Sequence, residues 1–214
     1  MRMKISGKRI MGMLLVLCLT IPLVGAGSAK GSVKLDLDEY HKSGNAAASA
    51  TGTAKSMHDG KITYVIPDSM EKIDAKDIFN EHIYNEGDGE LYLVNDAIFG
   101  IFYFDSDYFV EEFDEKDETR AIERAIISNI CPDEEKNLRW NSLTLKHYTY
   151  PTSQSTSRSG LKFDHYVGKY QNFRTEFAFT PAGNGLCVIL FIYNHDATSA
   201  TPPISVIESI KIGV

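Results

Sequence analysis

Apolar and polar residues alternate along the second half of the chain in a pattern typical of β-strands. The alternation is clearest at residues 141–150, 161–168 and 172–180, and side chains that alternate in this way point to opposite faces of a sheet. Residues 186–194 are apolar throughout, which predicts a central strand covered on both faces. The sequence Pro-Ala-Gly-Asn-Gly at 181–185 predicts a hairpin turn between the last two of these strands.

The preceding part of the chain adds three strands and a helix. Residues 61–67 read as a strand ended by a proline, and the apolar runs 91–96 and 97–105 predict a hairpin. Residues 117–131 place alanine and isoleucine at helical spacing. Isoleucines three residues apart within 201–214 predict a short closing helix that packs on the sheet. The pattern therefore predicts an α+β fold, a largely antiparallel multi-stranded sheet flanked by helices.

The first 29 residues have the three parts of a secretory signal peptide. Four basic residues precede an apolar run, and small residues end it at Gly27 and Ala29. We predict cleavage near Ala29, with Ala26 as the alternative, and hence a secreted or extracytoplasmic protein. The apolar run also has about the minimum length for a membrane span, ~17–18 residues, so an uncleaved anchor is the other interpretation.

Composition divides the rest of the chain in two. Residues 30–59 are rich in alanine, serine, glycine and threonine, which predicts a flexible linker because such a segment buries little apolar surface. Residues 60–214 are predicted to form a single domain. A domain of that length buries ~68–70% of its unfolded surface, which is enough for one core.

The chain becomes more acidic once the signal peptide is removed. The whole sequence has 22 basic and 29 acidic residues, and losing the four basic residues of the signal leaves 18 against 29, a net charge of −11. A surface of this charge repels nucleic acid and anionic lipid. We therefore expect no nucleic-acid partner, and membrane contact only transiently through the signal peptide. The expected partner is an unknown protein or envelope component.

Three segments resemble the PsbP/Mog1-like group of domains. They are YVIPDSMEKI at 64–73, the run at 173–193, and VIESIKI at 206–212. The group often has a tryptophan soon after the early proline, where this chain has Met70 or Ile73. The resemblance spans the predicted domain and implies an antiparallel sheet flanked by helices. It also implies a binding or accessory role, and it carries no shared catalytic set.

The stretch DSDYFVEEFDEKDE at 105–118 holds eight acidic residues in fourteen positions. It lacks the glycine of an Asp-x-Asp-x-Asp-Gly calcium loop, and its apolar residues are spaced for one helix face, which would turn the acids to solvent. A solvated helix edge, a docking surface and a calcium site are the three interpretations. The candidate binding residues are Asp105, Asp107, Glu111, Glu112, Asp114 and Glu115.

Two histidines are the candidate zinc ligands. If strands 141–150 and 161–168 are antiparallel neighbours, His147 and His165 lie nearly opposite each other. Two histidines without a carboxylate on the same face make half a zinc site. Packed, hydrogen-bonded histidines are the alternative.

Two cysteines follow the signal peptide. Export permits a disulfide between Cys131 and Cys187. Each also fits an ordinary buried thiol, because one lies at a predicted helix end and the other within an apolar strand.

Motifs of common enzymes are absent. His-Glu-x-x-His, Cys-x-x-Cys and Gly-x-Ser-x-Gly do not occur, and the Ser-x-x-Lys match at 69–72 lacks its companion elements. We therefore expect an exported, non-enzymatic binding or accessory domain at the bacterial cell surface or outside it, with no cofactor. The alternative is a secreted hydrolase with a dispersed active site around His147, His165 and a carboxylate.

Overall fold

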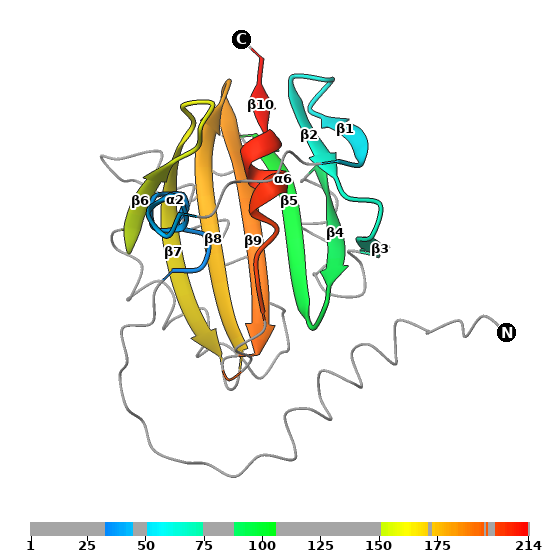
Figure 1. Ribbon diagram of the computed structural model, residues 1–214. Helices are drawn as coiled ribbons and strands as arrows, with labels where there is room; N and C mark the ends of the chain where they lie inside the picture. The colour runs from blue at the N-terminus through cyan, green and yellow to red at the C-terminus, as the bar shows by residue number, and fades with distance from the viewer. Residues whose placement is uncertain are drawn as a thin grey trace, which may run out of the picture.

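The protein contains two antiparallel sheets, the smaller one against one face of the larger (Figure 1). The structure is a computed structural model, and it describes residues 33–44, 51–74, 88–105, 151–170, 173–194 and 200–213, together with Asp196. Within these residues, no helix is long and apolar enough to cross a membrane.

The larger sheet has seven strands in the order β3-β4-β5-β9-β8-β7-β6, and every neighbouring pair is antiparallel. Hairpins join β4 to β5 and β8 to β9, as the turn residues predict. Asn95 in the first of these turns has a φ of 53°, a conformation that asparagine adopts more readily than most residues. In sheet order the strands are β3 (Glu71–Ile73), β4 (Asp88–Val94), β5 (Ala97–Asp105), β9 (Gly185–Asn194), β8 (Phe173–Ala182), β7 (Lys162–Tyr170) and β6 (Ser153–Thr156).

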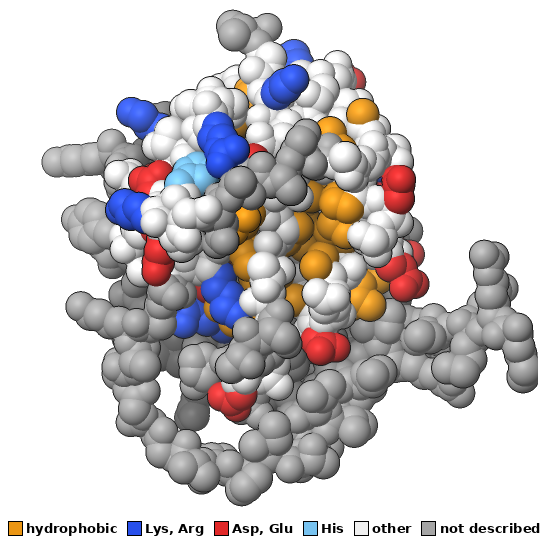
Figure 2. All heavy atoms as spheres, in the orientation of Figure 1, with side chains coloured by type: hydrophobic (Ala, Val, Ile, Leu, Met, Phe, Trp, Pro, Cys, Tyr) orange, Lys and Arg blue, Asp and Glu red, His pale blue; other side chains and the backbone are white. Residues whose placement is uncertain are grey.

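A second layer covers one face of the larger sheet. It contains the three-stranded sheet β1-β2-β10 and the helices α2 and α6. Figure 2 shows this face with its side chains, and hydrophobic groups gather beside α6 over β4 and β5. The elements of this layer are α2 (Leu37–Lys42), β1 (Thr53–Met57), β2 (Ile62–Ile66), α6 (Ile204–Ser209) and β10 (Lys211–Ile212).

Strand β5 shows how the larger sheet divides the core. Phe99 and Ile101 belong to the apolar cluster between the two layers, whereas Ile98, Phe102 and Phe104 belong to a second cluster on the opposite face. Successive side chains of a strand point to opposite faces, so a strand of continuous apolar residues serves both clusters. The central strand β9 is likewise buried along nearly its whole length, which confirms the prediction from its unbroken apolar sequence.

The predicted α+β class with flanking helices is wrong. The two helices of the described residues have six residues each, and the layer over the first face is largely a second sheet, so the arrangement is closer to a β-sandwich. The error arose because β1 has the polar sequence TAKSM, which carries no alternation of apolar residues. The closing helix α6 was correctly predicted, and the predicted helix 117–131 lies outside the described residues.

Residues 33–44, which we name the N-terminal strap, are packed against the larger sheet. Val33, Leu35 and Leu37 are 8%, 0% and 0% exposed and belong to the core between the layers. The strap and β1 both fall inside the segment 30–59 that the composition predicts to be a linker. The alternation Val-Lys-Leu-Asp-Leu-Asp directs three apolar side chains to one side even though the strap forms no strand.

The pairing of β7 differs from the expected one. Its outer neighbour is β6, which lies in the predicted loop 151–160, and Ser153 is the residue opposite His165. On the other side of His165 stands Ala178. The predicted register that sets His147 opposite His165 is therefore wrong, and His147 lies outside the described residues. A strand of serine, threonine and glutamine at a sheet edge has no apolar pattern by which the sequence could reveal it.

We predict that Leu37→Ala destabilises the protein by ~2–5 kcal/mol, because it removes a fully buried side chain and leaves a cavity. Glu39→Ala, an exposed position in the same helix, should change stability by no more than about 0.5 kcal/mol. Urea unfolding of both variants measures the difference. Equal stabilities would mean that the strap is not part of the folded core.

Candidate functional site

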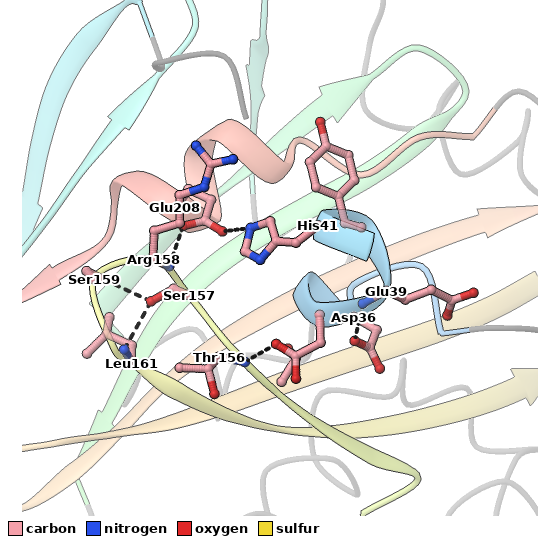
Figure 3. A network of polar contacts seen from close by, with 12 residues as sticks. Asp36, Glu39, His41, Thr156, Ser157, Arg158, Ser159, Leu161 and Glu208 are labelled. Carbon is pink, nitrogen blue, oxygen red and sulfur yellow. Dashed lines mark hydrogen bonds and ion pairs between the residues drawn. The ribbon is translucent and has the colours of Figure 1, made fainter. Parts of the chain in front are cut away.

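Polar contacts join the strap to the larger sheet and to α6. Figure 3 shows one such junction, at which Glu208 of α6 joins three segments. His41 Nε2 of α2 lies 2.7 Å from Glu208 Oε1, and the backbone N–H of Arg158 donates to Glu208 Oε2 at 2.9 Å. One carboxylate thus connects α6 both to α2 and to the turn between β6 and β7.

Two aspartates fix the start of α2. Asp36 caps the helix, because its Oδ1 accepts from the N–H of Glu39 at 3.1 Å. Asp38 Oδ1 accepts from the N–H of Thr156 at 3.0 Å. The second bond joins α2 to the edge strand β6 and so uses a main-chain donor at the rim of the sheet.

A fully buried carboxylate, Glu176 of β8, holds the other end of the strap. Its Oε2 accepts from the N–H of Leu35 at 3.0 Å, and its Oε1 accepts from the hydroxyl of Tyr193 at 2.5 Å. Arg174 Nε lies 3.0 Å from the same Oε1. Burial raises the pKa of Glu176 above its ordinary value, and the hydrogen bonds and Arg174 oppose that rise.

Lys34 lies over β9 beside this carboxylate. Its Nζ donates to the carbonyl oxygen of Ala200 at 2.6 Å and lies 4.3 Å from the centre of the Tyr193 ring. Burial lowers the pKa of Lys34, Glu176 opposes that shift, and Arg174 adds to it. The strap therefore contacts the sheet through a cation–π contact as well as through hydrogen bonds.

Another carboxylate, that of Glu90 in β4, is partly buried and joins the two sheets. Its oxygens accept from the hydroxyls of Tyr64 in β2, at 3.3 Å, and of Tyr92 in β4. Lys72 Nζ donates to it at 2.6 Å, and Lys55 Nζ lies 3.8 Å away. Burial would raise the pKa of Glu90, but the bonds from Lys72 and Tyr92 lower it below the ordinary value.

His165 and Ser155 form a close pair beneath α2. Ser155 Oγ lies 2.6 Å from His165 Nε2, and the two residues are 2% and 0% exposed. Burial lowers the pKa of His165 to about 4, against the opposing effect of nearby aspartates, so the imidazole is neutral at pH 7. A serine beside a neutral imidazole is the start of a nucleophilic site, but a substrate cannot reach a pair that is buried so fully.

One predicted binding residue lies within the described structure. Both oxygens of Asp105 accept from Asn184 Nδ2, at 3.0 and 3.1 Å, so this carboxylate joins the end of β5 to the β8–β9 turn. The described residues contain no group of three or more His, Cys, Asp or Glu side chains placed to hold a metal ion. The expectation of no cofactor, with calcium or zinc as the alternative, stays a prediction. The predicted residues outside the described ranges are Asp107, Glu111, Glu112, Asp114, Glu115 and His147.

Cys187 is fully buried in the central strand β9. Burial raises the pKa of its thiol to about 12, so the thiol is protonated at neutral pH. Cys131 lies outside the described residues, and the disulfide between the two stays a prediction.

The sequence indicates that Glu176 is buried, although the alternation within its own strand does not reveal this. Phe177 and Phe179 face one side of β8, which puts Glu176 on the other. The neighbouring strand 186–194 is apolar on both faces, so both faces of the sheet must be covered. A carboxylate facing such a covered surface needs partners within the fold. For His41 and Glu208 we find no comparable signal.

Comparison with known proteins leaves the family open. No protein-family model and no curated protein matches the chain. Among solved structures, it is similar to a protein from Bacteroides thetaiotaomicron VPI-5482, with a TM-score of 0.42 and 12% identity, over 76% of this chain. The match spans 49% of the length of that protein. A similarity at this level assigns neither fold nor function, and the resemblance to the PsbP/Mog1-like group stays a prediction.

We predict that His165 makes the protein less stable as the pH falls from about 6.5 to 4. An unfolded histidine takes up a proton in that range and the buried one does not, so protons favour the unfolded state. Urea unfolding of wild type and His165→Gln at pH 7.5 and 4.5 isolates this effect. Between pH 7.5 and pH 4.5, the free energy of unfolding of the wild type should fall by about 2–3 kcal/mol more than that of His165→Gln. Parallel pH profiles would show that His165 titrates normally.

Proposed function

We propose that this protein is an exported, non-enzymatic binding or accessory domain that acts at the bacterial cell surface or outside the cell. The observation that supports this proposal best is the use of its carboxylates. Glu176, Glu208 and Glu90 each join separate segments of the chain. A reaction needs ionisable groups that converge on an accessible position. These carboxylates instead hold segments of the fold together.

The position of the strap changes how such a domain would be displayed. Val33 is packed in the core, and in the sequence only residues 30–32 lie between it and the expected cleavage site. Three residues span no more than about 11 Å, which is too short for a flexible tether. Release after cleavage, or attachment close to the membrane without it, fits this geometry better than display on a long linker.

The charge of the exported chain indicates the kind of partner. At a net charge of −11 without the signal peptide, the protein attracts cationic surfaces and repels anionic lipid and nucleic acid. An envelope or extracellular protein with a basic surface is the partner that this charge favours.

A secreted hydrolase is the second candidate, and one distance favours it. Ser155 Oγ and His165 Nε2 are 2.6 Å apart, as a nucleophile and its base would be. Their burial opposes the idea, because both side chains lie beneath the strap and out of reach of a substrate.

One set of proteins separates the two candidates: residues 30–214 as wild type, as Ser155→Ala, and as Ser56→Ala, a control at an exposed serine. We expect all three to capture the same cross-linked partners from envelope extracts and none to hydrolyse ester, peptide or glycoside substrates. Turnover that disappears in Ser155→Ala but not in Ser56→Ala would establish the hydrolase. Failure of every form to capture a partner would contradict the binding role.

A further inference from the structure

An incompletely covered apolar area lies at the β3–β4 edge of the larger sheet. Met70 and Val94 are partly exposed and pack against the core between the layers. Glu71 is paired with Leu93, so continuing the antiparallel register by one step sets Met70 beside Val94. These two residues and Pro67 form what we name the β3–β4 patch.

A turn keeps the patch together. The N–H of Met70 donates to the carbonyl oxygen of Pro67 at 3.0 Å, and Pro67 is itself partly exposed. The patch therefore includes the turn that connects β2 to β3 and the end of β4. Methionine at its centre suits a binding surface, because its flexible, polarisable side chain adapts to different partners.

Two exposed acids border this patch. Asp68 lies two residues before Met70, and Asp96 lies in the turn after Val94; both are exposed. Glu71 faces the other side of the sheet, because its partner Leu93 packs in the cluster on that side. Figure 2 shows acidic side chains at the outer edge of the apolar area, near β3 and at the β4–β5 turn. Asp68 accepts one hydrogen bond, from Thr53 Oγ at 2.8 Å.

The nearby lysines do not cancel this charge. Lys72 and Lys55 both form ion pairs with Glu90, at 2.6 and 3.8 Å, and neither of these ion pairs involves Asp68 or Asp96. The patch therefore combines an apolar centre with a negative border, a combination that marks protein-interaction sites.

We propose that the β3–β4 patch docks a cationic amphipathic segment of a partner protein. The apolar side of that segment would cover Met70 and Val94, and its lysines or arginines would lie near Asp68 and Asp96. This inference rests on the proposed binding function and gives it a site and a partner chemistry. A second copy of the chain fits poorly, because two strongly acidic molecules repel each other, and anionic lipid fits poorly for the same reason.

Binding at so small a surface should be weak and sensitive to salt. Few apolar side chains are available, and interfaces of small area serve transient contacts. The charges lie at the exposed border, where ions screen them within about 10 Å at 0.1 M ionic strength.

The test uses residues 30–214 and a fluorescein-labelled amphipathic peptide of leucine and lysine, with a leucine–glutamate peptide as the ligand control. Fluorescence anisotropy measures binding to wild type and to two double variants. Met70→Ser with Val94→Ser removes the apolar centre and leaves the charge unchanged. Asp68→Asn with Asp96→Asn weakens the negative border.

Matched variants control for general effects. Leu161→Ser changes a partly exposed apolar residue that packs on the same core away from the patch. Glu39→Gln with Asp59→Asn removes two exposed acids elsewhere, so it alters the net charge as much as the border variant does.

We expect each patch variant to weaken binding of the leucine–lysine peptide at least tenfold, about 1.4 kcal/mol. The control variants should stay within about twofold, and the leucine–glutamate peptide should not bind. Equal affinities for patch and control variants would overturn the proposal. If Met70→Ser with Val94→Ser unfolds, photo-cross-linking of the peptide to wild type decides, since cross-links away from the patch would also overturn it.

The docking site and the proposed binding function can fail independently of each other. Envelope partners that wild type and patch variants capture equally would disprove this docking site and leave the binding role intact. Absence of any captured partner, together with peptide binding at the patch, would disprove the binding role in the envelope and leave the surface assignment standing.

Discussion

The buried carboxylate of Glu176 is the constraint on which the described arrangement depends. A carboxylate removed from water destabilises the fold unless donors surround it. Here the donors are the N–H of Leu35 and the hydroxyl of Tyr193, and the guanidinium of Arg174 forms an ion pair with the carboxylate. The first of these fixes the strap on the sheet. Once Leu35 is in place, α2 follows it, and Asp38 and His41 come within reach of Thr156 in β6 and Glu208 in α6.

The same use of charge extends to the second layer. Glu90 connects the larger sheet to the smaller through Tyr64 of β2 and Lys55 of β1, and Glu208 connects α6 to two neighbours. These carboxylates specify how covering elements sit on the sheet, while the apolar clusters supply most of the burial. Because these ionisable groups are committed to the fold, they support the proposed binding role over a catalytic one.

Sequence patterns predicted the elements whose apolar residues determine their position. The sequence predicts the strand β9, the hairpins and the closing helix, because the local order of apolar and turn residues indicates which side chains are buried. Strands β1 and β6 were missed because they are polar and gain their structure from pairing with β2 and β7. Composition predicts the strap to be part of a linker, since three alternating apolar residues carry little signal without the surface they cover. Glu176 was placed on the correct strand, but its partner Leu35 is 141 positions away, beyond the reach of any local pattern.

Hydrogen exchange at the amide of Leu35 tests this account most directly. If Glu176 holds the strap as part of the core, that amide should exchange as slowly as those of the central strand β9, and Glu176→Ala should accelerate it by orders of magnitude while β9 stays protected. Exchange of the wild-type Leu35 amide at the rate of an unstructured peptide would contradict the account, because the strap would then be a linker and the carboxylate would have another role.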